Sequence, residues 1–264
     1  MKKLIFCDID GTILDGSRGM NEASEKTKYA ISELKKDNYV FIASGRCRGL
    51  LTKEIFDLDP SGYILCNGAY AQIDGKSIYA EYFSDEAVRK ILEVTKKYEG
   101  FSILETLDSM YVDSLESRPF KLFMEHWGKA LDGFIEEKDY SDKYLIAMIG
   151  FMEKKTLRKA NEELREYVDI FDHKHFSSCD VNVKGVTKAT GVKKVMEYLG
   201  VAFEDTYCFG DGINDLEMLE AVRHPVIMAN SMPELKGRGF EETDDVLDDG
   251  FYNYLLAHKL IKAL

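Results

Sequence analysis

The sequence of 264 residues lacks any apolar run that approaches the roughly 20 residues a membrane-spanning helix needs. At its start, Met1-Lys2-Lys3 is followed by only four apolar residues, Leu4 to Cys7, before an aspartate. That run is too short for the apolar core of a secretory signal peptide. We therefore expect a protein with no membrane partner and no signal for secretion.

Positive charge is in the minority. The sequence has 35 lysine and arginine residues against 47 aspartate and glutamate residues, which gives a net charge of −12. Nucleic acids and anionic membranes are bound mainly through clustered basic residues, so the composition predicts no nucleic-acid partner. A small phosphorylated partner remains compatible, because a bound metal ion can reverse the electrostatic field inside one pocket.

Cysteines are few and scattered. There are five, an odd number, with no C-x-x-C pair. Cys7 and Cys208 end apolar runs, which favours buried, reduced thiols and predicts a cytoplasmic location. A zinc site built from His173, His175 and Cys179 is an alternative use of one cysteine, although no fourth ligand is evident.

What the sequence does contain is an alternation of strand and helix patterns in its first and last eighty residues. Short apolar runs predict strands at residues 3–7, 39–43, 63–66, 206–209 and 225–228. Amphipathic spacing predicts helices at residues 22–36, 50–56, 190–199, 216–221 and 251–264. Such alternation is typical of an α/β fold, here a Rossmann-like parallel sheet covered by helices.

The pattern changes in the middle of the chain. Helical spacing at residues 85–98, 119–130 and 154–167 is mixed with more polar strand patterns at 144–151 and 171–177. We interpret this stretch as an inserted α/β domain. The predicted organisation is a catalytic core made of residues 1–83 and 184–264, with the insertion at 84–183.

Small or acidic residues follow three of the apolar strands directly. They are Asp8–Thr12 (DIDGT), Ser44–Arg46 (SGR) and Gly210–Asp215 (GDGIND). In open α/β sheets, ligands bind outside the carboxyl ends of the strands. We therefore expect these segments to meet at one crevice, provided that their strands are neighbours in the sheet.

Asp8 and Asp10 stand two residues apart, so in an extended chain both carboxylates point to the same side. Carboxylates that close repel one another, and Asp211 and Asp215 add two more charges. A hard cation that prefers oxygen ligands, such as Mg²⁺, removes this repulsion. The run taken alone also fits a plain acidic turn, but the other two segments favour a functional site.

An anion would find donors in the same segments. Thr12 offers a hydroxyl group, and Ser44-Gly45 offers a hydroxyl group and backbone amides just before a helix. Lys188 precedes a predicted helix and can hold a phosphate and a carboxylate together as a compact positive charge. A strand-to-helix turn and a surface lysine are the alternatives for these residues.

In this order, the segments resemble the motifs of the haloacid dehalogenase (HAD) superfamily, and within it the Cof-type sugar-phosphatase-like hydrolases. DIDGT is similar to the first motif, SGR to the second, Lys188 to the third and GDGINDLEML (Gly210–Leu219) to the fourth. The resemblance implies a magnesium-dependent phosphatase that acts on a small phosphorylated metabolite. It also implies that the inserted domain is a cap that covers the site and determines specificity.

The resemblance implies a role for each matching residue. Asp8 would be the nucleophile that becomes an aspartyl phosphate, and Asp10 would act first as acid and then as base. The side chains of Asp8 and Asp211 and the backbone carbonyl of Asp10 would bind the metal, while Asp215 would support the metal or Lys188. The implied site residues are Asp8, Asp10 and Lys188 for catalysis; Thr12, Ser44, Gly45, Lys188 and Asn214 for the phosphate; and Asp8, Asp10, Asp211 and Asp215 for Mg²⁺.

Two other functions are compatible with the same motifs. A phosphomutase would return the phosphate to a bound sugar, and a catalytically silent protein would only bind a sugar phosphate. The second is disfavoured because both Asp8 and Asp10 are present. Sugar phosphates, pyridoxal phosphate, flavin mononucleotide and polyol phosphates are all open as substrates, and the protein is expected to be a monomer or a small homo-oligomer.

Overall fold

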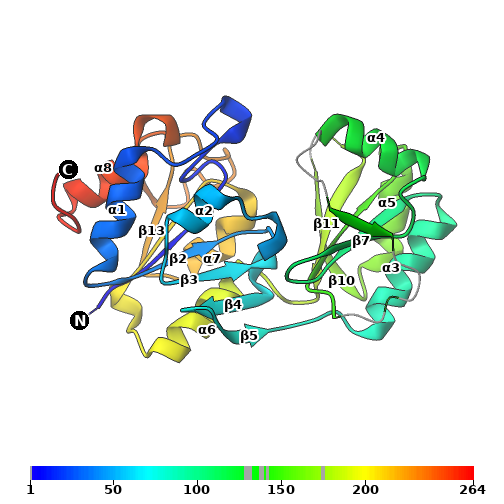
Figure 1. Ribbon diagram of the computed structural model, residues 1–264, viewed down its shortest axis with the longest axis horizontal. Coiled ribbons are helices and arrows are strands. Elements are labelled where there is room, and N and C mark those ends of the chain that lie inside the picture. Colours follow the sequence, from blue (N-terminus) through cyan, green and yellow to red (C-terminus); the bar gives the residue numbers. More distant parts are fainter. Residues whose placement is uncertain (1, 128–132, 137–139, 141–142, 174–175) are drawn as a thin grey trace. The chain divides into compact units, whose positions relative to one another are not determined.

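The computed structural model describes residues 2–127, 133–136, 140, 143–173 and 176–264, and the chain divides into two compact units (Figure 1). Unit 1 comprises Met1–Gly45, Leu51–Tyr79 and Thr187–Leu264, and unit 2 comprises Arg46–Leu50 and Ala80–Val186. The predicted α/β class, with a Rossmann-like sheet and an inserted second α/β unit, is confirmed. The division falls a few residues from the predicted limits 83/84 and 183/184, and it places residues 46–50 with the insertion.

Unit 1 is built on one sheet whose neighbouring strands β13, β12, β1, β2 and β3 all pair in parallel. The antiparallel strand β4 follows β3, which the sequence pattern did not predict. In spatial order the strands are β14 (Glu241–Glu242), β13 (His224–Ile227), β12 (Thr206–Gly210), β1 (Leu4–Cys7), β2 (Tyr39–Ala43), β3 (Gly62–Leu65), β4 (Tyr70–Ile73) and β5 (Lys76–Ala80).

Helices cover both faces of this sheet. Successive residues of a strand point to opposite faces, so an apolar strand places apolar side chains on both faces and both must be covered. Leu4 and Phe6 share one apolar cluster with Val192 and Met218. On the opposite face, the ring of Phe209 lies 4.8 Å from that of Phe251. The helices of unit 1 are α1 (Glu25–Lys35), α2 (Lys53–Asp57), α6 (Lys188–Leu199), α7 (Leu216–Glu220) and α8 (Gly250–Ala257).

The predicted helices of unit 1 form, but three of them are shorter than predicted. The helix predicted at residues 22–36 begins only at Glu25, after its cap residue Ser24. The pattern at residues 50–56 gives only α2, because residues 48–50 form a separate 3-10 turn. The last helix, predicted to extend to residue 264, ends at Ala257. Lys259 has a positive φ of 56°, which a continuing α-helix does not allow.

Unit 2 contains a second sheet, in which all pairs are antiparallel except β7 with β8. In spatial order its strands are β10 (Val168–Asp172), β11 (Ser178–Val183), β9 (Ile146–Gly150), β6 (Phe101–Glu105), β7 (Met110–Val112) and β8 (Phe134–Glu136). The helices are α3 (Asp85–Lys97), α4 (Arg118–Trp127) and α5 (Lys154–Leu164). The strand predicted at residues 171–177 agrees only in part, because β10 covers Val168–Asp172, and residues 174 and 175 of the predicted range lie outside the described residues.

The two faces of this second sheet carry different helices. Phe101 contacts Phe120 and Phe123 of α4 through its ring. Cys179 belongs to the opposite face, and its thiol donates to the side chain of Asn161 on α5. Among the described residues, no helix has the length and apolar character needed to cross a bilayer.

A buried carboxyl group makes unit 2 sensitive to pH. Burial raises the pKa of Glu105 from 4.5 to about 8, although a hydrogen bond from Cys47 lowers it. The folded state therefore retains a proton that the unfolded state loses above pH 4.5, so stability falls as pH rises from 4.5 to about 8.

We predict that Glu105→Gln, which keeps the shape but removes the ionisation, raises the free energy of unfolding at pH 8 by about 2 to 4 kcal/mol. The gain should vanish only at pH values well below 4.5, since Glu105 is then protonated in both states. Denaturant titrations at the two pH values measure the difference, with Glu136→Gln on the exposed part of β8 as control. An equal effect of the Glu105 change at both pH values would contradict the assignment.

Candidate active site

The three segments that carry the motifs follow adjacent strands of unit 1. β1 pairs with β12 on one side and with β2 on the other. Asp8, the residue after β1, therefore lies directly beside the end of β12, and its backbone N–H donates to the carbonyl of Phe209 at 3.0 Å. The predicted adjacency of these strands is confirmed, and it brings their carboxyl ends to one edge of the sheet.

A buried lysine joins two of the carboxylates. Lys188 is the first residue of α6, and its Nζ donates to Oδ1 of Asp8 at 2.5 Å and to Oδ1 of Asp215 at 2.6 Å. The side chains of Lys188 and Asp215 are 1% and 0% exposed. The lysine is thus no surface residue, and the alternative drawn from the sequence for it is wrong.

The electrostatics of this cluster follow from its burial. Burial, and then the charge of Asp215, raise the pKa of Asp8 from 3.8 to about 7, although Lys188 lowers it. Burial by itself lowers the pKa of Lys188, but the charges of Asp215 and Asp8 outweigh it and raise that pKa above its ordinary value. Lys188 therefore stays charged at any physiological pH.

Asp215 is fully occupied by protein groups. Its second oxygen, Oδ2, accepts the backbone N–H groups of Asp211 and Gly212, both at 3.0 Å, while Oδ1 holds Lys188. Of the two roles predicted for Asp215, these contacts favour support of Lys188 and of the loop after β12 over direct contact with a metal.

The carboxylate of Asp211 faces the turn after β1. Its Oδ1 accepts the hydroxyl of Thr12 at 3.1 Å. A Cβ on Gly11 would lie only 2.2 Å from Oδ2 of Asp211, and Gly11 has a φ of +84°. Only glycine therefore allows this approach of the two loops. Burial, and then the charges of Asp8 and Asp215, raise the pKa of Asp211 from 3.8 to about 8.

The donors present suit a divalent cation. Asp8, Asp211 and Asp215 each offer a carboxylate oxygen, and these oxygens lie within 4.8 Å of one another. When all groups are ionised, the three carboxylates exceed the single ammonium group by two negative charges. Oxygen donors of this kind are those that Mg²⁺ prefers. Since Asp215 is occupied, Asp8 and Asp211 are the side chains best able to bind the ion.

The remaining predicted residues lie around this cluster or at the same edge of the sheet. Asp10 is exposed, and its charge adds to those that raise the pKa of Asp8. Ser44 is buried just after β2, and Gly45 follows it. Asn214 lies on the short 3-10 turn Ile213–Asp215, directly before Asp215.

A family model describes the same span of chain. It is the model of the haloacid dehalogenase-like hydrolases, and it matches residues 5–255. The chain belongs to this family.

Relatives of this haloacid dehalogenase-like hydrolase are named as phosphatases. "Putative phosphatase YkrA" of Bacillus subtilis (strain 168) is 34% identical over 255 residues, with 94% of each chain covered. The 5-amino-6-(5-phospho-D-ribitylamino)uracil phosphatase YitU of the same organism is 26% identical over 263 residues, with 96% of each chain covered. The solved structure of the HAD subclass IIB sugar phosphatase BT4131 has a TM-score of 0.82 at 22% identity, covers 98% of this chain and 100% of its own, and shows the fold. The predicted family and the phosphatase class are confirmed.

The sequence reasoning missed two residues that shape the site of this hydrolase. A Cβ on Gly68, whose φ is +94°, would lie 2.0 Å from the carbonyl oxygen of Thr187. Gly68 therefore allows the loop after β3 to approach the start of α6, where Lys188 lies. The pair Asn67-Gly68 was visible in the sequence only as the end of a strand. The second residue is Asn230, whose contacts to Gly11 and Val246 have no local pattern in the sequence.

The zinc alternative finds no support. His173 bonds through its ring nitrogens to Ser178 and Asp180, at 2.8 and 3.1 Å. Cys179 points to the opposite face of the second sheet, toward Asn161. His175 lies outside the described residues. The one cluster of metal-ligand type found in the part of the chain that the structure describes is Asp8, Asp211 and Asp215.

Proposed function

We propose that this protein is a magnesium-dependent phosphomonoester hydrolase that acts on a small phosphorylated metabolite through an aspartyl phosphate on Asp8. The observation that carries the proposal is the buried pairing of Lys188 with Asp8 and Asp215, beside Asp211. Lys188 holds the carboxylate of Asp8 in place, and Asp8 and Asp211 together can bind a metal ion beside it. Two positive charges at one carboxylate suit the binding of a phosphate dianion. An ion pair with only a structural role would not require the additional carboxylate of Asp211.

In the first step, a carboxylate oxygen of Asp8 forms a bond to phosphorus, and the bond from phosphorus to the ester oxygen breaks. The carboxyl group of Asp10 gives its proton to the departing oxygen, so an alcohol leaves. Lys188 fixes the orientation of Asp8 and offers positive charge to the phosphoryl oxygens. The hydroxyl of Ser44 and the amide of Asn214 are proposed as further donors to those oxygens.

In the second step, Asp10, now a carboxylate, removes a proton from a water molecule. The water oxygen bonds to phosphorus, the bond to Asp8 breaks, and inorganic phosphate leaves. Asp10 is protonated again and Asp8 is a free carboxylate, so both residues return to their starting states. Asp215 takes no direct part, because both of its oxygens are used to position Lys188 and the loop after β12.

Asp8 and Asp211, with the backbone carbonyl of Asp10, would hold Mg²⁺, which supplies positive charge to the phosphate oxygens when bound. Thr12 fixes the orientation of Asp211. The metal would also keep Asp8 and Asp211 ionised near neutral pH, where the two carboxyl groups are partly protonated when no metal is bound.

The substrate class is proposed from the relatives. One is named for a phosphorylated ribityl compound, and a solved structure with this fold is named a sugar phosphatase. A phosphate ester of a sugar or polyol is therefore the proposed substrate. Unit 2 would supply the specificity, as the family's caps are expected to do.

The proposal predicts release of inorganic phosphate from a panel of phosphate monoesters only when Mg²⁺ is present. With excess EDTA the rate should fall by at least about 100-fold, because Lys188 alone would face the phosphate charge. Addition of Mg²⁺ beyond the chelator should restore the rate. An unchanged rate in EDTA would remove the metal from the mechanism.

The same assay separates the hydrolase from the mutase alternative. A hydrolase yields one phosphate for each ester consumed, whereas a mutase yields an isomeric ester and little phosphate. Product analysis by phosphorus NMR distinguishes the two outcomes. Binding without consumption of any ester would favour the silent binding protein.

A further inference from the structure

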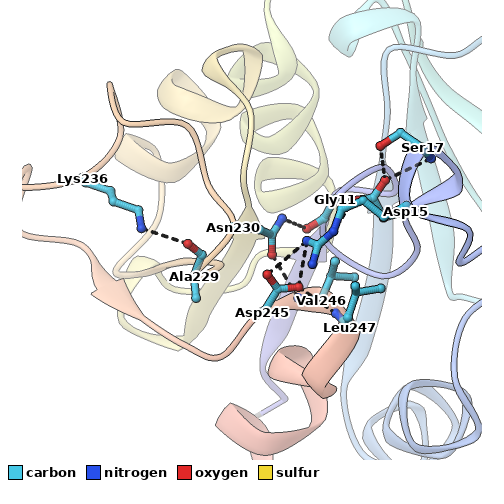
Figure 2. A network of polar contacts seen from close by, with 10 residues as sticks. Gly11, Asp15, Ser17, Ala229, Asn230, Lys236, Asp245, Val246 and Leu247 are labelled. Carbon is cyan, nitrogen blue, oxygen red and sulfur yellow. Dashed lines mark hydrogen bonds and ion pairs between the residues drawn. The ribbon is translucent and has the colours of Figure 1, made fainter.

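Asn230 bridges two loops at the active edge of unit 1 (Figure 2). It lies three residues beyond the end of β13. Its amide Nδ2 donates to the backbone carbonyl of Gly11 at 2.7 Å, and its Oδ1 accepts the backbone N–H of Val246 at 2.9 Å. One half-buried side chain thus connects the first motif to the segment 245–247.

The turn that Asn230 contacts carries the proposed acid. The N–H groups of Thr12, Ile13 and Leu14 all donate to the carbonyl of Ile9, at 3.3, 3.0 and 3.1 Å. These bonds close the turn around Asp10 and Gly11. The bond from Asn230 then fixes the peptide unit between Gly11 and Thr12, which is separated from Asp10 only by the Asp10–Gly11 peptide unit.

The chain beyond this turn is attached to the same segment. Arg18 makes two hydrogen bonds to the carboxylate of Asp245, at 2.9 and 3.0 Å. Asp245 also accepts the N–H of Leu247 (Figure 2). Asp15 accepts the N–H and the hydroxyl of Ser17, so the intervening turn is closed as well. Residues 11 and 18 are therefore both held by contacts to residues 245–247, directly or through Asn230.

We infer that Asn230 is a positioning residue for Asp10, and this inference rests on the proposed phosphatase function. By holding the Gly11 carbonyl, Asn230 sets the direction of the turn and so the place of the Asp10 carboxyl group relative to Asp8. Asparagine suits this role because one planar amide donates to one loop and accepts from the other. Its loss would displace the acid and leave the nucleophile Asp8, which Lys188 holds separately.

The decisive experiment compares two substrates whose leaving groups differ. p-Nitrophenolate leaves from p-nitrophenyl phosphate with little need of protonation, whereas an alkoxide needs a proton. For Asn230→Ala we expect kcat/KM for an alkyl phosphate to fall by about 30-fold or more, which is a partial loss of the roughly 100- to 10,000-fold that a positioned general acid contributes. For p-nitrophenyl phosphate the fall should be about threefold or less when Mg²⁺ is saturating, because the metal site is then filled and the attack by Asp8 is unchanged.

Asn253→Ala is the matched control. Asn253 also bridges this part of the chain, through Asp244 and the carbonyl of Asp248, but it does not contact the turn of Asp10. Both substrates should keep their wild-type kcat/KM in this variant. A purely structural role for Asn230 predicts similar losses in the two variants and for the two substrates.

A second variant covers the case in which Asn230→Ala fails to fold. Asn230→Asp keeps the shape and the acceptor for Val246 but has no donor for Gly11, so the same selective loss is expected. An added charge that merely repels phosphate would slow both substrates equally. Equal losses for the two substrates, or no loss, overturn the inference. Failure of the proposed function is recognised separately, as a wild-type protein that hydrolyses neither ester.

Discussion

Asp8→Asn is expected to reduce kcat for an aryl phosphate by at least about four orders of magnitude, which is the scale on which loss of a covalent nucleophile acts. An amide at this position cannot form the aspartyl phosphate. The variant keeps the volume of the side chain, so the surrounding contacts of the sheet edge remain. The loss is measured by phosphate release at saturating substrate and Mg²⁺.

The same variant should fold at least as well as the wild type in the absence of metal. The pKa of Asp8 is raised from 3.8 to about 7, so at pH values above 3.8 its ionisation favours the unfolded state. Asparagine removes this term, and Lys188 keeps Asp215 as partner. Thermal unfolding at pH 8 in EDTA should give a Tm no lower than that of the wild type.

Asp37→Asn, at an exposed position before β2, is the control for a change of one charge. It should leave both activity and Tm unchanged. Residual turnover of Asp8→Asn above about one part in a thousand, with chemical conversion back to aspartate excluded by mass spectrometry, would contradict the covalent mechanism.

Lys188→Met should lower the free energy of unfolding of the metal-free protein by about 3 to 5 kcal/mol, the usual effect of removing one partner of a buried ion pair. Methionine fills a similar volume but leaves the buried carboxylates of Asp8 and Asp215 without their shared cation. Turnover should fall by about 100-fold or more, because the phosphate also loses that charge.

The destabilisation should depend on pH in a defined direction. Lys188 itself stays charged between pH 6 and 8.5, because its pKa is raised above 10.5. The carboxyl groups of Asp8 and Asp211, with pKa values of about 7 and 8, gain protons as the pH falls through this range. Protonation reduces the repulsion that the missing lysine exposes, so the deficit should shrink toward pH 6.

Denaturant titrations of the metal-free variant and wild type at the two pH values measure this change. Lys184→Met is the matched control, since Lys184 is exposed, pairs with Asp169 and lies four positions before Lys188 in the sequence. Its effect should stay within about 0.5 kcal/mol at both pH values. A Lys188 deficit that grows as the pH falls would show that the buried carboxyls do not cause it.

Much of unit 1 could be predicted because its strands are buried on both faces. The apolar runs of β1, β2 and β12 are visible within four or five residues, and a polar residue marks the end of each. Strands at or near sheet edges were missed. β5 begins with exposed Lys76 and Ser77 and has no fully buried residue, and β14 consists of two exposed glutamates, so neither shows the long apolar run of a strand buried on both faces.

In unit 2, the predicted helix at residues 85–98 agrees closely with α3, whose serine cap and apolar stripe are local signals. The strands were harder to predict. β6 follows α3 after a short turn, and its buried Ser102 and Glu105 interrupt the apolar run. Polar residues inside a strand are tolerated where hydrogen bonds or protonation offset the cost of burial, which depends on neighbours distant in sequence.

The sequence by itself determined the fold class, the family resemblance and the residues expected at the site, because each of these depends on patterns only a few residues long. Only the tertiary structure decided how those residues are paired. Lys188 meets Asp8 across 180 positions, and Asn230 meets Gly11 across 219. Such contacts arise from the order in which the strands pair, and a local pattern of residues does not contain that order.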